Sequence, residues 1–129
     1  MPNVIRSSIP VTIANGTALS PAVDLMQARF IGIEMPAAWT AAAISFQGSS
    51  DGVTFTDLFG VFAEISVSAA ASRTVMFFTS GGVPSATVPT STGLDNCFPR
   101  FVKIRSGLTG GAVNQGADRL LRVLLTAEG

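Results

Sequence analysis

The chain has 129 residues and a mass of 13.3 kDa, which is the size of a single domain. It contains no His, no Tyr and one Cys, which excludes His-based catalytic triads, His-liganded metal sites, tyrosyl chemistry and an intrachain disulfide. Eight basic residues balance eight acidic ones, so the net charge does not favour binding to nucleic acid or to an anionic membrane.

The low charge content points to an assembly. Charged residues make up 12% of the chain and hydrophobic residues 47%, and the mean hydropathy is +0.48. With so few charges to cover a free surface, we expect much of the outside to be buried against partners. The first residues do not resemble a signal peptide, and no apolar run reaches the length of a membrane-spanning helix, so we expect a chain made and retained in a cytoplasm.

Alternation of apolar and polar residues is the main structural signal along the chain. It predicts strands over residues 5–13, 30–35, 42–47, 53–59, 61–67, 73–78, 100–105 and 119–125. The apolar residues of segment 119–125 would also fit one face of a helix. The segment is short, however, and every neighbouring segment is predicted to be a strand, so we predict a strand here too. The sequon Asn15-Gly16-Thr17 predicts a tight turn, and Ser49-Ser50-Asp51-Gly52 predicts a hairpin turn. The alanine-rich residues 37–43 could add one helical turn.

This spacing of short strands predicts an all-β fold, an antiparallel, jelly-roll-like β-sandwich of about eight strands in one domain over residues 1–129. Residues 80–99 are rich in Gly, Pro, Ser and Thr and form a predicted long loop, either a crossover between sheets or a contact arm. In the strand before this loop, alternation places Val75 and Phe77 inward and Phe78 outward. In the strand after it, Lys103 and Arg105 are expected to point outward.

No catalytic constellation emerges from the polar residues. Asp51 and Asp57 lack the spacing of a calcium loop, and we interpret them as a turn residue and a strand-end cap. Glu34 and Glu64 are the two carboxylates that a glycosidase pair would need, but both lie on polar faces of alternating strands. Cys97 has no activating base, and 107–111 lacks the Lys-Ser/Thr of a phosphate loop and predicts a Gly-rich hairpin. We therefore expect no enzyme activity, no cofactor and no metal.

Two surface features remain as alternatives. Five basic residues could form a stripe on adjacent C-terminal strands, but no aromatic platform accompanies them: Arg100, Lys103, Arg105, Arg119 and Arg122. Trp39, Phe55 and Phe59 could form a weak glycan-stacking platform. For Trp39, a position at the edge of the core is the simpler interpretation.

The segment 39–59, which includes Phe46-Gln47-Gly48-Ser49-Ser50-Asp51-Gly52, resembles a hairpin pattern of small virion proteins from tailed bacteriophages. The strand 101–107, followed by 114–119 and an apolar closing strand, resembles the second half of that pattern. The resemblance covers residues 29–59 and 98–126. It implies a discoidin-like jelly roll that sits on a phage head as a decoration, cement or spike protein.

The resemblance and the composition together predict a structural virion protein, specifically a capsid decoration or cement protein. Its expected partners are the major capsid protein or other virion proteins, and we expect a homo-oligomer, a trimer or a dimer, with no nucleic-acid or membrane partner. The candidate interface residues are Phe78, Val83, Val88, Leu94 and Phe98. The alternative is an adhesion or carbohydrate-binding module on a head or tail fibre.

Overall fold

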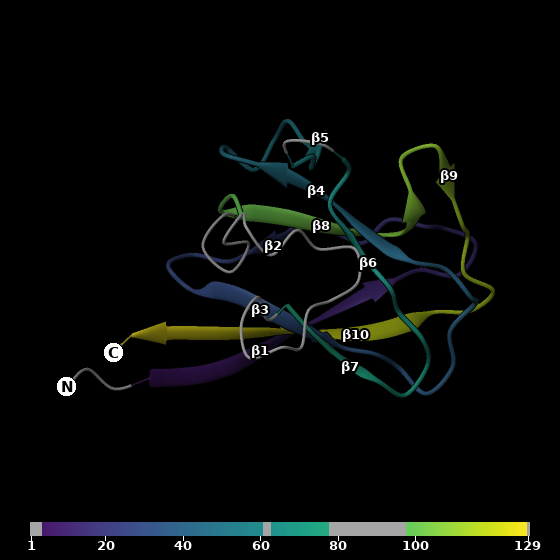
Figure 1. Cartoon of the computed structure of the whole chain (residues 1–129), viewed down its shortest axis with the longest axis horizontal. Coiled ribbons are helices and arrows are strands. Elements are labelled where there is room, and N and C mark those ends of the chain that lie inside the picture. The colour runs from purple at the N-terminus through teal and green to yellow at the C-terminus, as the bar shows by residue number, and fades with distance from the viewer. Residues whose placement is uncertain (1–3, 61–62, 78–97, 129) are drawn as a thin grey trace.

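The computed structural model describes residues 4–60, 63–77 and 98–128, and these form two antiparallel sheets packed face to face (Figure 1). One sheet has the order β1-β10-β3-β7, with β1 at Val4–Ile13, β10 at Arg119–Glu128, β3 at Arg29–Glu34 and β7 at Thr74–Met76. We call it the terminal sheet. No described residue belongs to a helix that could cross a membrane.

The other sheet, which we call the hairpin sheet, has the order β2-β8-β4-β5. Its strands are β2 at Val23–Asp24, β8 at Phe101–Leu108, β4 at Ile44–Ser49 and β5 at Thr56–Asp57. Two short strands complete it: β6 at Ser66–Val67 pairs with β4, and β9 at Gly111–Ala112 pairs with β8. The all-β antiparallel sandwich predicted from alternation is confirmed, and the ambiguous last segment is strand.

The alternation that predicted the strands also sets which side chains enter the core. In β1 and β10 the facing pairs Val11–Leu121 and Ile9–Val123 place apolar side chains on the inner face of the terminal sheet. Val11, Leu121 and Val123 are buried there. In the hairpin sheet, Phe46 lies opposite Ile104, and both are fully buried. A one-residue slip in either pair would turn these side chains to the outside, so burial fixes the register.

Four phenylalanine rings form the centre of the core. Phe30 of β3 and Phe46 of β4 come from opposite sheets, and their ring centroids are 5.7 Å apart in an edge-to-face arrangement. Phe77 and Phe98 complete the cluster, with Phe77 4.9 Å and Phe98 4.8 Å from Phe30. Such geometries add to the free energy gained by burying the rings. The expected inward position of Phe77 is confirmed.

The segment 53–59 forms less strand than predicted. Only Thr56 and Asp57 pair with β4, because residues 53 and 54 donate their backbone N–H groups to a side chain of the preceding turn instead. Of the predicted strand 61–67, Ser66 and Val67 pair with β4, while Glu64 bridges back to Phe59. The alanine-rich segment 37–43 contains no helical turn.

Three tight turns are confirmed. Ala14 O accepts the N–H of Thr17 at 3.0 Å, which closes the turn at Asn15-Gly16. Ser49 to Gly52 connect β4 to its partner, and residues 107–111 form the β8–β9 hairpin in which Leu108 faces Gly111. The predicted long loop 80–99 lies almost wholly outside the described residues, apart from its last two positions.

Candidate functional site

The turn after β4 is built by two side chains. Ser49 Oγ accepts the backbone N–H of Gly52 at 2.9 Å and of Asp51 at 3.2 Å. The Asp51 carboxylate accepts the N–H groups of Val53 at 2.8 Å and Thr54 at 3.0 Å, and the Ser49 hydroxyl at 2.8 Å. Gly52 has a φ of 79°, in the region that glycine adopts without strain. The Ser-Ser-Asp-Gly sequence therefore forms a self-contained turn, as predicted for Asp51.

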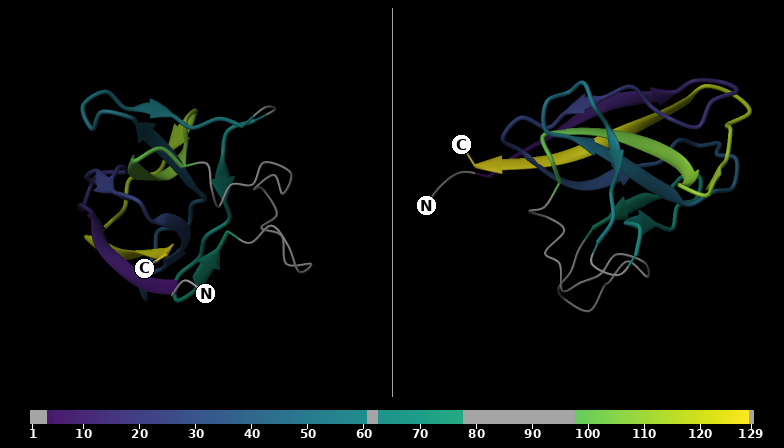
Figure 2. Two further views of the ribbon diagram at one scale, coloured as in Figure 1. Left: turned by 90° about the vertical axis from the view of Figure 1, so that its left-hand side faces the viewer. Right: turned by 90° about the horizontal axis from the view of Figure 1, so that it is seen from above.

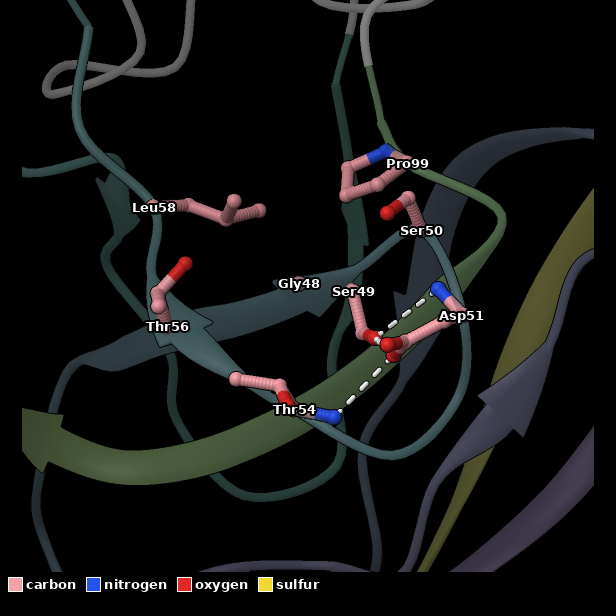
Figure 3. Close-up of a pocket in the computed structure, with 8 residues that line it drawn as sticks. All are labelled: Gly48, Ser49, Ser50, Asp51, Thr54, Thr56, Leu58 and Pro99. Carbon is pink, nitrogen blue, oxygen red and sulfur yellow. Dashed lines mark hydrogen bonds between the residues drawn. The ribbon is translucent and has the colours of Figure 1, made fainter.

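A pocket of about 330 Å³ opens beside this turn, between the β4–β5 hairpin and Pro99 (Figure 3). Ser50, Thr54 and Thr56 supply hydroxyl groups to its wall, and Leu58 faces Pro99 across it. A Cβ atom at Gly48 would collide with the Pro99 ring and with Leu58, so the pocket requires glycine at that position. Its wall offers hydrogen-bonding groups and two apolar surfaces, but among the described lining residues Asp51 is the sole ionisable group and is already engaged.

These hydrogen bonds lower the pKa of Asp51. The N–H groups of Val53 and Thr54, followed by the Ser49 hydroxyl, stabilise the ionised form and bring the pKa from 3.8 to about 2. Because the folded-state pKa lies below the unfolded one, Asp51 stabilises the fold above about pH 4, and this contribution disappears as the pH falls toward 2.

We expect Asp51→Asn to be less stable than the wild type at pH 7, with the gap in melting temperature closing toward pH 2. The substitution keeps a side-chain oxygen as acceptor and removes only the charge. Thermal unfolding followed by circular dichroism between pH 2 and pH 7 measures this difference. A gap that stays constant across this range would mean that the charge of Asp51 does not contribute.

Arg105 is the most deeply engaged charged residue of the described chain. Its guanidinium donates to Asp57 Oδ1 at 2.6 Å, to Glu64 Oε2 at 2.8 Å and to Ser45 Oγ at 2.9 Å. It also donates to Thr109 Oγ1 at 2.8 Å. Its side chain is only 9% exposed. We call this group the Arg105 cluster.

The Arg105 cluster adds to one expectation and corrects another. Arg105 leaves β8 on the outer face of the hairpin sheet, as expected, and is buried there because Glu64 and Thr109 cover it. Asp57 is the ion-pair partner of Arg105 and not merely a strand-end cap, and the hydrogen bond from Arg105 lowers its pKa. The cluster ties together β4, β5, β8 and two loops, and every hydrogen-bonding group in it has a partner within the chain. It is therefore a structural element and not an open site.

The other basic residues do not form a stripe. Arg100 pairs with Asp24 at 2.9 Å, and Arg122 lies 3.9 Å from Glu34 on the outer face of the terminal sheet. The Lys103 ammonium sits 4.5 Å from the centre of the Phe55 ring, in a cation–π contact. Arg119 donates to Gln115. Each of these cations is held by a local contact, and β8 and β10, along which they lie, belong to different sheets, so they are not on adjacent strands.

The three aromatic residues of the expected glycan platform are also separated. Trp39 is half-buried beyond the start of β4, packs against the core and donates its ring N–H to Ala42 O at 3.1 Å. Phe55 lies beside the opposite end of β4, where Lys103 covers its ring. Phe59 is 59% exposed. Trp39 therefore occupies the core-edge position, and the three rings share no common face.

Glu34 lies at the end of β3, and Glu64 lies in the loop before β6; the two carboxylates belong to different ion pairs, so the structure does not bring them together. Within the described residues, no group of three or more His, Cys, Asp or Glu side chains has the arrangement of a metal site.

Of the candidate interface residues, Phe78, Val83, Val88 and Leu94 lie outside the described residues, as does Cys97. Phe98 is half-buried and packs into the aromatic cluster, with its ring 5.2 Å from Phe46. Apart from Phe59, the large apolar side chains that the described surface exposes were not singled out from the sequence. These are Ile5, Met26, Val53, Phe59, Leu108 and Leu120.

Val53 and Phe59 are the most prominent of these side chains on the hairpin sheet, at 82% and 59% exposed. Val53 follows the Asp51 turn directly, and its N–H is bonded to the Asp51 carboxylate and not to a strand. We call this pair the hairpin patch. Comparisons of the chain with protein-family models, with curated proteins and with solved structures find no match.

Proposed function

We propose that the chain is a structural virion protein of a tailed phage, a decoration or cement protein that binds the assembled head. The observation that carries the proposal is the combination of 12% charged residues with large apolar side chains left open to solvent. Isolated apolar side chains on a surface are ordinary, but on a chain with so little charge they favour burial in an assembly.

The hairpin that carries the resemblance to phage virion proteins supports the same proposal. The segment from Gln47 to Thr56 forms a strand, a turn held by Asp51 and a returning strand. The turn presents Val53 at the outer surface, and Phe59 follows the returning strand, so a neighbouring protein can reach both side chains. Both are apolar, which fits a protein surface as the partner.

The chain would act by binding and not by catalysis. A protein that binds only the assembled lattice stabilises it by mass action, as any ligand of a native state does. Many identical copies on a symmetric shell allow a modest affinity per copy to add up through avidity. The major capsid protein is the proposed partner, and the virion is the proposed location.

The alternative, carbohydrate binding, has less support. Glycan recognition relies on an exposed aromatic face with polar groups around it. Trp39 is turned toward the core, and Lys103 covers the Phe55 ring. The pocket beside Pro99 supplies hydroxyl groups but no aromatic ring among its lining residues.

Binding to heads tests the proposal directly. Purified heads of the encoding phage, stripped of this protein, are mixed with the wild type and sedimented. We expect the wild type to sediment with them, and the double variant Val53→Ser/Phe59→Ser to bind at least about tenfold more weakly, because exposed anchors dominate such contacts. Leu120→Ser is the matched control, since Leu120 is exposed on the other sheet and should leave binding unchanged. Failure of the wild type to bind, or equal binding by the double variant, would contradict the proposal.

A further inference from the structure

The strand β1 forms one margin of the terminal sheet along ten residues, from Val4 to Ile13 (Figure 2). β10 covers one of its edges over the whole length, and no described segment pairs with the other edge. An open strand edge presents a row of backbone donors and acceptors that can pair with another strand. The opposite margin of the same sheet, β7, spans only three residues.

The orientation of the β1 backbone follows from its neighbours. Ile31 O of β3 accepts from Phe77 N, and the N–H of Met35, directly after β3, donates to Arg73 O; the odd-numbered residues along β3 therefore point their backbone groups toward β7. Gly32 alternates with these residues, so its backbone N–H and C=O point to the other side, toward β10. There Gly32 lies opposite Leu124.

The same alternation carries across β10 to β1. Since Leu124 faces β3, Val123 faces β1, where its partner is Ile9. The odd-numbered residues of β1 thus bond to β10, and the even-numbered ones, among them Arg6, Ser8 and Pro10, direct their backbone groups to the open edge. Pro10 lacks an N–H, but at this position no hydrogen bond between β1 and β10 is lost.

The inner face of β1 is not fully covered either. Val11 and Ile13 are buried beneath the hairpin sheet, whereas Ile5, which points to the same side, is 50% exposed. Among the described residues, β1 therefore has one edge without a partner strand and, at its N-terminal half, an apolar side chain that is half exposed. An additional strand beside β1 would pair with the free backbone groups and cover Ile5.

We propose that this strand is β1 of a second copy, paired antiparallel across a two-fold axis so that the two terminal sheets become one. The pairing that makes the most backbone hydrogen bonds places Ser8 opposite Ser8 and Arg6 opposite Pro10. It then brings Ile5 of one copy beside Val11 of the other, in the closer, non-hydrogen-bonded type of pair. This register also keeps the Arg6 cations of the two copies apart.

Charge and sequence favour self-pairing over other partners. Among residues 5–13, Arg6 carries the only formal charge, so no like charges oppose each other in the dimer. An antiparallel pair of identical strands is self-complementary, as a two-fold interface requires. This strand pairing would be the interface of the homo-oligomer that the composition predicts. The dimer would form whether or not the chain binds a capsid.

The oligomeric state of the full chain tests the inference without any capsid. By light scattering and sedimentation at micromolar concentration, we expect a dimer for the wild type. Ser8→Lys places two ammonium groups at the two-fold axis and should weaken dimerisation by more than about tenfold. Thr74→Lys, at the exposed margin β7, is the matched control and should remain dimeric. A monomeric wild type, or a Ser8→Lys variant as dimeric as the control, would overturn the inference.

Cross-linking reports the register independently of any loss of folding. In a Cys97→Ser background, Ser8→Cys should form an intermolecular disulfide on mild oxidation, and Thr74→Cys should not. Hydrogen exchange of the wild type provides a second measure, because the N–H groups of Arg6 and Ser8 should be protected in the dimer and exchange faster on dilution. Rapid exchange of these amides at concentrations where the chain is dimeric would place the interface elsewhere.

Discussion

Phe46→Ala is expected to lower the free energy of unfolding by about 3–5 kcal/mol, the usual cost of deleting a large buried side chain and leaving its cavity. Phe46 is fully buried on β4 and contacts Phe30, Phe77 and Phe98, whose ring centroids lie 5.2 to 5.9 Å away. These rings come from both sheets, so the cavity cannot close without moving one sheet relative to the other. Denaturant unfolding, followed by the fluorescence of the single Trp39, measures the loss.

Phe59→Ala is the matched control for this measurement. It removes the same side chain from a position that is 59% exposed, and surface substitutions of this kind change stability by about 0.5 kcal/mol or less. An equal loss for both variants would show that the aromatic cluster is not the centre of the core.

The Arg105→Met variant should be destabilised by about 3 kcal/mol, because removing one partner of a buried ion pair leaves the other charges uncompensated. Asp57 and Glu64 both lose their cation, and Ser45 and Thr109 lose a donor. Denaturant unfolding at pH 7 measures the loss. Arg100→Met is the control, since the Arg100–Asp24 pair is solvent-exposed and worth about 1 kcal/mol or less.

The pH dependence separates the charge effect from lost packing. Arg105 lowers the pKa of Asp57 below its unfolded value, so the pair stabilises the fold above about pH 4 and loses this contribution as the carboxylate is protonated. The gap between wild type and Arg105→Met should therefore narrow below pH 4. The triple variant Arg105→Met/Asp57→Asn/Glu64→Gln should recover part of the loss at pH 7. No recovery, together with a gap independent of pH, would mean that packing alone explains the effect of Arg105.

The strands that alternation predicted over most of their length are the five long ones. Each of these strands has one face toward the core: β1, β3, β4, β8 and β10. Burial of that face produces the alternation of apolar and polar residues from which the strand can be predicted. The short β2 and β9 were not predicted, because two-residue strands have no period to detect. The turn at Asp51 was predicted because its hydrogen bonds are local, between residues two or three positions apart.

The Arg105 cluster shows where sequence reasoning reaches its limit. Arg105 alternates with inward residues, which predicts its position on the outer face of its strand but not its burial there. Its burial depends on Glu64, which is 41 residues away in the sequence, and on the chain path that folds this residue over β8. Similarly, Val53 was assigned to a strand by alternation, whereas its N–H is bonded to the Asp51 side chain and its own side chain is exposed.

The most direct test of the proposed function is the protein inventory of purified particles of the encoding phage, measured by quantitative mass spectrometry. We predict that this chain is present in a copy number comparable to that of the major capsid protein, as expected for a protein that decorates a symmetric shell. Its absence from intact particles, or a copy number limited to that of a tail component, would contradict its assignment as a decoration protein of the head.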